Sequence, residues 1–339
     1  MKRSAVGLAE VADWHNLAAA FHRAAQGKGS RDEVRFFRAD LHGELARLQN
    51  DILDGSVAVG TMRSFRIRDP KPRIIHAPCF RERVLHHALM AHVGPVLDRA
   101  LVEDTFACRV GKGTLAAVHR ARHHLGRYPW YAKIDIRGYF AAIDHTLLLG
   151  KLARRFKDCG LLHLMTRIIH AHQTSPGMGL PIGALTSQHF ANHYLGEIDR
   201  LLLETCRVRG MVRYMDDIVW WGDDKAAMKE SMTRTRDHVA GILRLEVKEP
   251  VHIGRSGDGL LFCGYRILPD RLLLSRRRKR RYIAARRRWE EDYAAGRIDA
   301  ATLQTGMTHT LALTAHTDAS AWRREQLRRQ PLADLLCNV

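Results

Sequence analysis

The sequence predicts an α+β fold, in which short strands form a sheet and helices pack against it. Three apolar runs have the length and residue types of strands or a hairpin: Trp130 to Ile136, Met211 to Trp221 and Leu260 to Ile267. Stretches with helical spacing lie between them, without a glycine-rich phosphate loop or a strict βαβ repeat. This alternation favours a sheet with helices packed on one side.

The first 54 residues are predicted to form a helical lead. Apolar residues recur there at helical spacing, with charges on the opposite face (Phe36, Phe37, Leu41, Leu45, Leu48). Residues 61–80 are basic and contain Pro70, Pro72 and Pro78, which forbid a continuous helix. We interpret this segment as a positively charged hairpin. Helical patterns follow over residues 82–101 and 114–125.

The C-terminal part has a different composition. Arginines and lysines crowd residues 275–288, and helix-forming residues continue to the end, which predicts a basic helical lobe. We therefore expect three regions: residues 1–54, residues 55–268, which hold the apolar runs, and residues 269–339.

The charge of the chain points to a polyanionic partner. Its 339 residues include 55 lysines and arginines against 36 acids, a formal net charge of +19. Such an excess favours nucleic acid. A membrane partner is not expected, because we find no apolar run of about 18 residues and no signal peptide, so we expect a cytoplasmic protein. The six cysteines form no C-x-x-C pair, which argues against a structural zinc site.

Asp216 and Asp217 are the first candidate catalytic residues. They lie between the apolar flanks of the run 211–221, which reads as a hairpin with two carboxylates at its tip. Adjacent carboxylates repel each other unless a cation neutralises them, and Mg²⁺ prefers carboxylate oxygens. The alternative is an ordinary turn, since aspartates are common there. Asp223 and Asp224 form a second pair, which we interpret as helix caps.

Asp135 strengthens the metal-site interpretation. It stands between Ile134 and Ile136 near the end of an apolar strand, where an acid is costly to bury unless it is paired or bound to a metal. If neighbouring strands bring Asp135 to Asp216 and Asp217, the three acids hold two cations about 4 Å apart, an arrangement that serves phosphoryl transfer.

These residues together resemble the reverse transcriptase family. Tyr214-Met215-Asp216-Asp217 is similar to its YxDD box, and Asp135-Ile136-x-x-Tyr139-Phe140 to its first aspartate motif. Further blocks follow in the same order: Lys71-Pro72-Arg73-Ile74-Ile75, Gly179 to Gly183, Lys248, and Phe262-Cys263-Gly264-Tyr265. The resemblance covers about residues 60–270. It implies a right-hand polymerase fold with fingers, an antiparallel palm sheet with helices on one face, and a basic helical thumb.

The resemblance also implies a set of site residues. Asp135, the Ile136 carbonyl, Asp216 and Asp217 would hold two Mg²⁺ ions, for which Mn²⁺ can substitute. Substrate-binding residues would be Lys71, Arg73, Tyr139, Ser187, Gln188 and Lys248. Residues in contact with nucleic acid would be Gly264, Tyr265, Arg276, Arg277, Arg278, Lys279 and Arg280. The partners would be a template RNA, a primer or cDNA strand and deoxynucleoside triphosphates.

One block suggests a subgroup. Ile182-Gly183-Ala184-Leu185-Thr186-Ser187-Gln188 resembles the (I/V/L)GxxxSQ signature of reverse transcriptases from diversity-generating retroelements, whereas intron enzymes usually have QGxxxSP. This resemblance implies error-prone copying opposite adenines and a small, basic, oligomeric accessory protein as partner. The alternatives are an intron-derived or phage-defence reverse transcriptase and a non-catalytic palm that binds RNA.

Several residue roles have ordinary structural alternatives. Tyr139 is the expected steric gate against a ribose 2′-hydroxyl, yet Tyr139 and its neighbour Phe140 both suit a buried core. For Arg73 the alternative is an ordinary charged hairpin whose side chains are exposed to solvent, and composition alone favours it. Ser187 and Gln188 also suit the start of a helix beneath the sheet. The arginine cluster favours duplex or structured RNA, with an acidic partner protein as the alternative.

Overall fold

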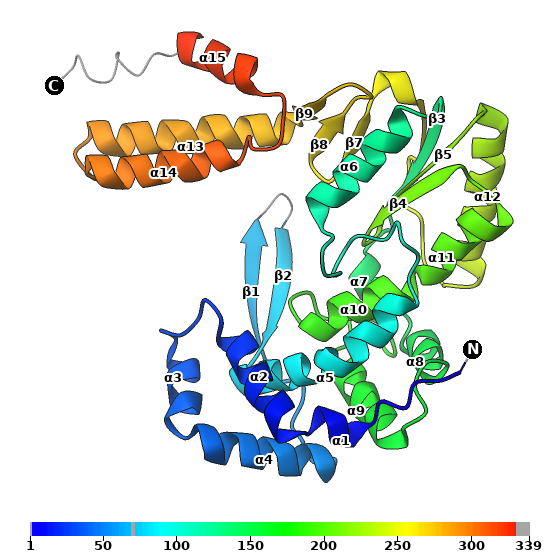
Figure 1. Cartoon of the computed structure of the whole chain (residues 1–339), viewed down its shortest axis with the longest axis vertical. Helices are drawn as coiled ribbons and strands as arrows, with labels where there is room; N and C mark the ends of the chain where they lie inside the picture. Colours follow the sequence, from blue (N-terminus) through cyan, green and yellow to red (C-terminus); the bar gives the residue numbers. More distant parts are fainter. Residues whose placement is uncertain (1, 69–71, 330–339) are drawn as a thin grey trace.

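The computed structural model describes residues 2–68 and 72–329, and it has the expected mixture of helices and antiparallel sheets. Four helices precede the first strand and lie at one end of the molecule (Figure 1). They are Leu8–Val11 (α1), Trp14–Ala25 (α2), Asp32–Ala39 (α3) and Leu41–Leu53 (α4). Asp13 caps α2 by accepting a hydrogen bond from the Asn16 N–H at 3.0 Å. The predicted helical character of this region is confirmed.

A basic hairpin projects from this end of the molecule, as the prolines predicted (Figure 1). Its antiparallel strands are Met62–Arg68 (β1) and Pro72–Pro78 (β2). Most of their side chains are exposed, so the hairpin owes little to a core of its own. Lys71 lies outside the described residues.

The base of β2 is joined to the loop that carries the predicted subgroup motif. The His76 N–H donates a hydrogen bond to the Ile182 carbonyl at 2.8 Å. Gly183 follows with a φ of 124°, and a Cβ there would lie 2.9 Å from the His76 carbonyl oxygen. Glycine is therefore required for this close approach.

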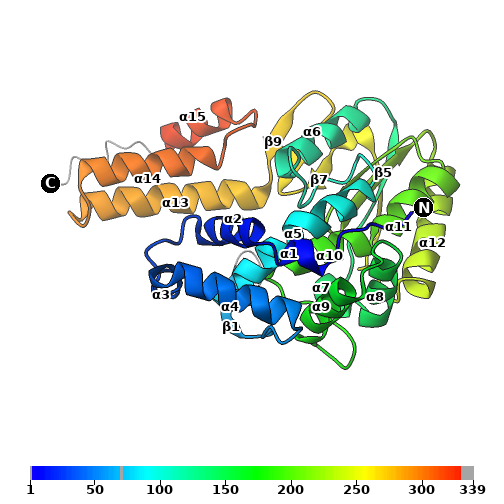
Figure 2. The same ribbon diagram turned by 60° about the horizontal axis from the view of Figure 1, so that its bottom comes forward.

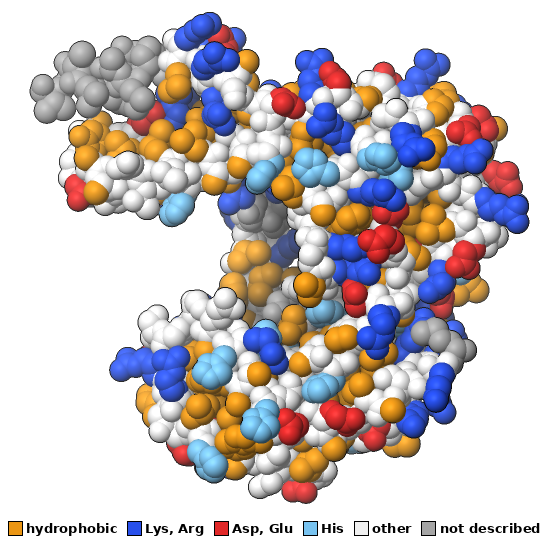
Figure 3. All heavy atoms as spheres, viewed as in Figure 1, with side chains coloured by type: hydrophobic (Ala, Val, Ile, Leu, Met, Phe, Trp, Pro, Cys, Tyr) orange, Lys and Arg blue, Asp and Glu red, His pale blue; other side chains and the backbone are white. Residues whose placement is uncertain are grey.

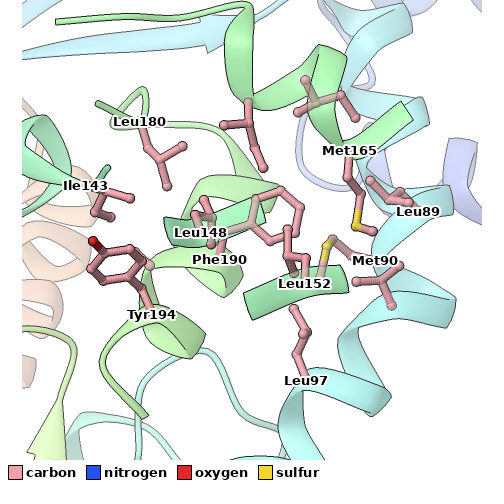
Figure 4. Packing of buried hydrophobic residues seen from close by; sticks show 14 of the residues in the cluster. Leu89, Met90, Leu97, Ile143, Leu148, Leu152, Met165, Leu180, Phe190 and Tyr194 are labelled. Carbon is pink, nitrogen blue, oxygen red and sulfur yellow. The ribbon is translucent and has the colours of Figure 1, made fainter. Parts of the chain in front are cut away.

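The largest hydrophobic core lies among the helices below the central sheet. These helices are Phe80–Arg99 (α5), Tyr139–Ala142 (α7), His145–Ala153 (α8), Cys159–His170 (α9), Leu185–Tyr194 (α10) and Gly196–Arg200 (α11), with a π-helical turn at Leu201–Thr205. Figure 4 shows Leu89 and Met90 of α5 packed towards Leu152 of α8 and Met165 of α9. The N-terminal helices contribute to the same core.

The central sheet has four antiparallel strands in the order β4-β5-β3-β6. They are Trp130–Ile134 (β3), Gly210–Tyr214 (β4), Asp217–Gly222 (β5) and His252–Arg255 (β6). Helix α12 (Lys225–Gly241) packs on one face and α6 (Thr114–Leu125) on the other. The prediction of helices on one face is therefore wrong. Both faces are apolar, since Trp220 and Trp221 point to opposite sides of β5 and both are fully buried.

A second antiparallel sheet connects the central sheet to the C-terminal helices. Its strands, in the order β7-β8-β9, are Leu260–Phe262 (β7), Tyr265–Ile267 (β8) and Leu272–Leu274 (β9). A 3₁₀ turn at Ser256–Asp258 precedes it, and three helices follow: Arg276–Ala294 (α13), Ala300–Ala312 (α14) and Ser320–Arg329 (α15). Helices α13 and α14 lie side by side and extend away from the sheets in both ribbon views (Figures 1 and 2). The predicted basic helical lobe is thus confirmed as far as residue 329.

A membrane-spanning helix is not found in the described part of the chain, where every helix is too short or too polar.

Candidate active site

Asp135 lies at the end of β3, directed away from the core. Its neighbours Ile134 and Ile136 are buried, so the alternation of an extended chain leaves the Asp135 carboxyl on the open side. The Lys248 N–H donates to the Asp135 carbonyl at 2.8 Å, and Lys248 Nζ lies 3.2 Å from Asp135 Oδ2. A segment more than a hundred residues away therefore fixes both the backbone and the side chain of this acid.

Asp216 and Asp217 lie at the turn between β4 and β5, which confirms the predicted hairpin. Tyr214 pairs with Asp217, so Met215 and Asp216 form the two-residue turn. Met215 has a φ of 56°, a left-handed conformation that costs a non-glycine residue about 1 kcal/mol. Arg213 Nη1 donates to the Met215 carbonyl at 3.3 Å and so stabilises this conformation.

Arg213 anchors the turn to the helices beneath the sheet. Its Nε and Nη2 each donate to one carboxylate oxygen of Asp199 at 2.7 Å, and both side chains are fully buried. Its Nη1 also donates to Asn192 Oδ1 at 2.8 Å. This bidentate pair satisfies two buried charges at once. Arg213 was not among the predicted site residues, although a charge within an otherwise apolar strand is a signal that could have found it.

Asp135 and Asp216 face each other at the floor of a cavity. Burial, followed by the charge of Asp135, raises the pKa of Asp216 to about 7. Among the described residues no lysine or arginine forms an ion pair with Asp216. A bound cation would remove the repulsion between these two carboxylates.

Asp217 has a partner of its own. Lys133 Nζ lies 2.9 Å from Asp217 Oδ1 and donates to the Leu261 carbonyl at 2.7 Å. Burial raises the pKa of Asp217, while Lys133 acts in the opposite direction. Lys133 was not among the predicted site residues. It lies two positions before Asp135 in the same strand, and this spacing was the signal that could have found it.

One cavity of about 980 Å³ brings together the three predicted aspartates and part of the predicted substrate-binding residues. This aspartate cavity is lined by Asp135, Ile136, Asp216, Asp217, Arg73, Tyr139, Phe140, Lys248 and Arg278, among others. In Figure 3, lysine, arginine and acidic side chains gather at the inner end of a deep notch between the C-terminal helices and the lower part of the molecule. Within residues 2–68 and 72–329, no three histidine, cysteine or acidic side chains are grouped as a metal site. The expected three-acid grouping is therefore not found, and Asp217 pairs with Lys133 instead.

Tyr139 and Phe140 both line the aspartate cavity but differ in burial. Tyr139 is 3% exposed, and its hydroxyl donates to the Ala191 carbonyl of α10. Burial raises the pKa of Tyr139 well above its usual range. The Phe140 ring is half-buried and lies edge-on to Tyr139, with centroids 5.8 Å apart. The hydrogen bond fixes the Tyr139 ring at the wall of the cavity, and the steric-gate role stays a prediction.

Two predicted substrate residues lie elsewhere. Ser187 is buried within α10, and Gln188 Oε1 accepts a hydrogen bond from Cys108 Sγ at 3.5 Å. Neither residue is among those that line the aspartate cavity, whose described wall includes Ile182 of the same motif. Both residues belong to helix α10 beneath the sheet, which is the structural alternative to substrate binding.

The predicted nucleic-acid residues lie on two sides of the β7–β9 sheet. The Arg278 guanidinium stacks 3.8 Å from the Tyr265 ring centroid and lines the aspartate cavity next to Gly264. Arg276, Arg277 and Lys279 line a separate cavity of about 1110 Å³ between β6 and β9. Arg280 is exposed on α13. The arginine cluster is thus divided, and only Arg278 reaches the aspartates' cavity.

Comparisons with known proteins place these features in one family. A family model described as "Reverse transcriptase (RNA-dependent DNA polymerase)" matches residues 67–249. The group II intron-encoded protein LtrA of Lactococcus lactis is 24% identical over 196 residues, which cover 54% of this chain and 32% of LtrA. A putative COX1/OXI3 intron 1 protein of Saccharomyces cerevisiae is 23% identical over 169 residues, which cover 47% and 20% of the two chains.

Among solved structures, telomerase from Candida tropicalis in complex with a fragment of telomeric RNA has a TM-score of 0.48 and 13% identity, covering 84% of this chain and 58% of that one. The chain spans a third or less of the length of the curated relatives that it matches.

Proposed function

This chain belongs to the reverse transcriptase family, because the family model matches more than half of its 339 residues, and from that premise we propose that it is an RNA-directed DNA polymerase. The observation that carries the proposal is that Asp135 and Asp216 lie together in the aspartate cavity. Their motifs are separated by about 80 residues in the chain, and no local pattern requires them to meet.

The donor set fits divalent cations. Burial and the charge of Asp135 drive Asp216 towards protonation, so a cation is the partner that would let both acids ionise. Asp135, the Ile136 carbonyl and Asp216 would hold Mg²⁺ or Mn²⁺, with Asp217 supporting the site from its ion pair with Lys133. When bound, two such ions supply positive charge to the attacking and leaving oxygens of nucleotidyl transfer.

The remaining cavity residues would bind and orient the substrates. Arg73 and Lys248 bring positive charge to the wall where a triphosphate would lie. Lys71, outside the described residues, stays a predicted substrate-binding residue. Tyr139, held by its hydrogen bond to Ala191, would pack under the sugar and exclude a 2′-hydroxyl. Arg278 at the cavity wall, with Gly264 and Tyr265 beside it, would contact the primer strand.

The architecture supports a right-hand arrangement. The β1–β2 hairpin and its neighbouring helices would be the fingers, the central sheet the palm, and α13–α15 the thumb. The notch in Figure 3 would then hold the template and primer duplex next to the aspartate cavity, whose lining includes Arg73, Lys248 and Arg278.

The motif at residues 182–188 further supports a role in a diversity-generating retroelement, with error-prone copying opposite template adenines. A small basic accessory protein would be the partner. An intron-derived enzyme is the second candidate, because the intron proteins of L. lactis and S. cerevisiae are relatives.

Primer extension on an RNA template tests the proposal. We expect Mg²⁺-dependent dNTP incorporation that EDTA abolishes and that Asp216→Asn lowers at least about 100-fold, the scale expected when one electrostatic interaction at a reacting centre is removed. Asp223→Asn is the matched control, because Asp223 pairs with Arg209 on the surface and should leave the rate unchanged. Full activity of Asp216→Asn would refute the site.

Sequencing the cDNA from the same reactions tests the subgroup. Misincorporation concentrated opposite adenines is expected for the retroelement role. Even copying of all four bases would favour the intron-derived or phage-defence alternative, and a wild-type protein without Mg²⁺-dependent incorporation would favour a non-catalytic RNA-binding palm.

A further inference from the structure

A second cavity, here called the basic cavity, lies where the N-terminal segment meets α8 and α11. Its volume is about 570 Å³, and its described lining residues and those of the aspartate cavity are two separate sets. The Ser4 N–H donates to the Arg155 carbonyl at 2.7 Å, which holds the N-terminal segment there, beside α8 in Figure 1. The basic side chains that line it are Arg3, Lys151, Arg154, Arg155 and Arg200.

One acid, Glu197, lies among the described lining residues, and Arg200 also pairs with Glu204 outside the lining at 3.2 Å. Glu197 lies 2.5 Å from Lys151 Nζ and 3.8 Å from Arg154 Nη1, so its single charge is already shared between two cations. Burial, followed by the charges of Arg200 and Arg154, lowers the pKa of Arg155. Cations held this close repel one another, and an anion between them would relieve the repulsion.

His193 of α10 forms part of the wall of the basic cavity. Its side chain lines the basic cavity and is 7% exposed, and its Nδ1 is buried without a hydrogen-bond partner among the described residues. Burial and the nearby Arg155 and Lys151 lower the pKa of His193 to about 4, so the ring is neutral at pH 7. The ring therefore adds no positive charge to the wall, and its Nδ1 is itself closed to solvent, so the arginines and Lys151 are the groups that would bind an anion.

We propose that the basic cavity binds a phosphate group, either as free phosphate or as part of a nucleic-acid strand. Guanidinium groups match the planar edges of a phosphate with two parallel hydrogen bonds, and at least two of the arginines come from different elements, as a fixed anion site requires. The proposal does not depend on polymerase activity, because it concerns residues outside the aspartate cavity.

The test compares two double variants that remove equal charge. Arg154→Gln with Arg200→Gln removes two of the five positive charges that line the basic cavity. Arg35→Gln with Arg234→Gln is the matched control: the Arg35 side chain is 70% exposed against 77% for Arg154, and Arg234 pairs with a glutamate one helical turn away, as Arg200 does. Circular dichroism first verifies that both variants are folded. Binding of inorganic phosphate and of a short single-stranded RNA is then measured by calorimetry without Mg²⁺ at constant ionic strength.

We expect saturable phosphate binding by the wild type and the control variant, weakened at least tenfold in the cavity variant. If the cavity variant also binds RNA more weakly, the ligand is a phosphate of a nucleic-acid strand. If its RNA affinity is unchanged, the ligand is free phosphate. Equal phosphate binding by the two variants, or no saturable binding by the wild type, would overturn the proposal. None of these outcomes bears on Asp216, so failure here and failure of the proposed function are distinguishable.

Discussion

Each of the three aspartates at the cavity floor has a different neighbour. Asp135 lies against Lys248, Asp217 against Lys133, and Asp216 faces Asp135. The pKa of Asp216 is therefore raised to about 7 by burial and by a like charge. The three side chains are chemically identical, but their surroundings differ. Which of them lies next to a lysine depends on contacts between residues far apart in the sequence.

His86 of α5 allows the effect of burial to be measured on one residue. It is 1% exposed, and burial lowers its pKa to about 3, against about 6.5 in an unfolded chain. Between pH 3 and pH 6.5 this histidine binds more protons in the unfolded state than in the folded state. Its contribution to the free energy of unfolding is therefore present above about pH 6.5 and is lost as the pH falls towards 3. Relative to His86→Leu, the wild type should lose about 2 kcal/mol of unfolding free energy between pH 7 and pH 5. Urea denaturation at both pH values checks this, and a pH-independent difference would contradict it.

At the scale of elements, α13 joins two environments. Its first turn carries Arg278, which reaches the aspartate cavity, while Arg276 lines the neighbouring cavity and Arg280 is exposed. Further along, Arg286 and Glu290 form a buried ion pair at 2.5 Å that fixes the helix within its own lobe. The N-terminal charges of the helix are therefore divided between two cavities and solvent, and later ones serve packing.

Neutralising α13 should change how RNA binding depends on salt. For Arg276→Gln with Arg280→Gln we expect the slope of log affinity against log salt concentration to become shallower by about 0.7 for each phosphate that the variant no longer neutralises, as for single strands. Fluorescence anisotropy with a single-stranded RNA at several salt concentrations measures the slope. The double variant of Arg35 and Arg234, on α3 and α12, should keep the wild-type slope. An unaltered slope in the α13 variant would mean that these arginines do not neutralise phosphates.

At the scale of the whole molecule, the N-terminal helices and the central sheet share one core. Phe21 of α2, Phe37 of α3 and Phe80 of α5 form an aromatic cluster with ring centroids 5.2 to 5.9 Å apart. Both hydrophobic clusters, by contrast, draw their described members from residues up to Leu272. The two ends of the chain thus differ in what they contribute to stability.

Truncation should reveal this asymmetry. A chain beginning at residue 55 loses the packing partners of α5 and exposes its apolar face, so we expect loss of cooperative unfolding and aggregation. A chain ending at Ser275 keeps both clusters and should unfold cooperatively in thermal denaturation followed by circular dichroism. A cooperatively folded N-terminal truncation would show that the shared core is dispensable.

The sequence by itself determined the local features. Alternation and turn chemistry located the hairpin that carries Asp216 and Asp217, and the prolines located the basic hairpin at residues 62–78. The order of the motifs also indicated the reverse transcriptase family, and the match to the family model over residues 67–249 then showed it. These features depend on residues close together in the chain, which a linear pattern contains.

Tertiary structure alone decided which distant residues meet. Lys133 reaches Asp217 across 84 positions, and Lys248 reaches Asp135 across 113. It also buried Arg213 against Asp199 and placed a helix on each face of the sheet. Ser187 became a buried helix residue for the same reason. Such contacts follow from how whole elements pack, because burial and charge pairing are properties of the assembled core and no single segment contains them.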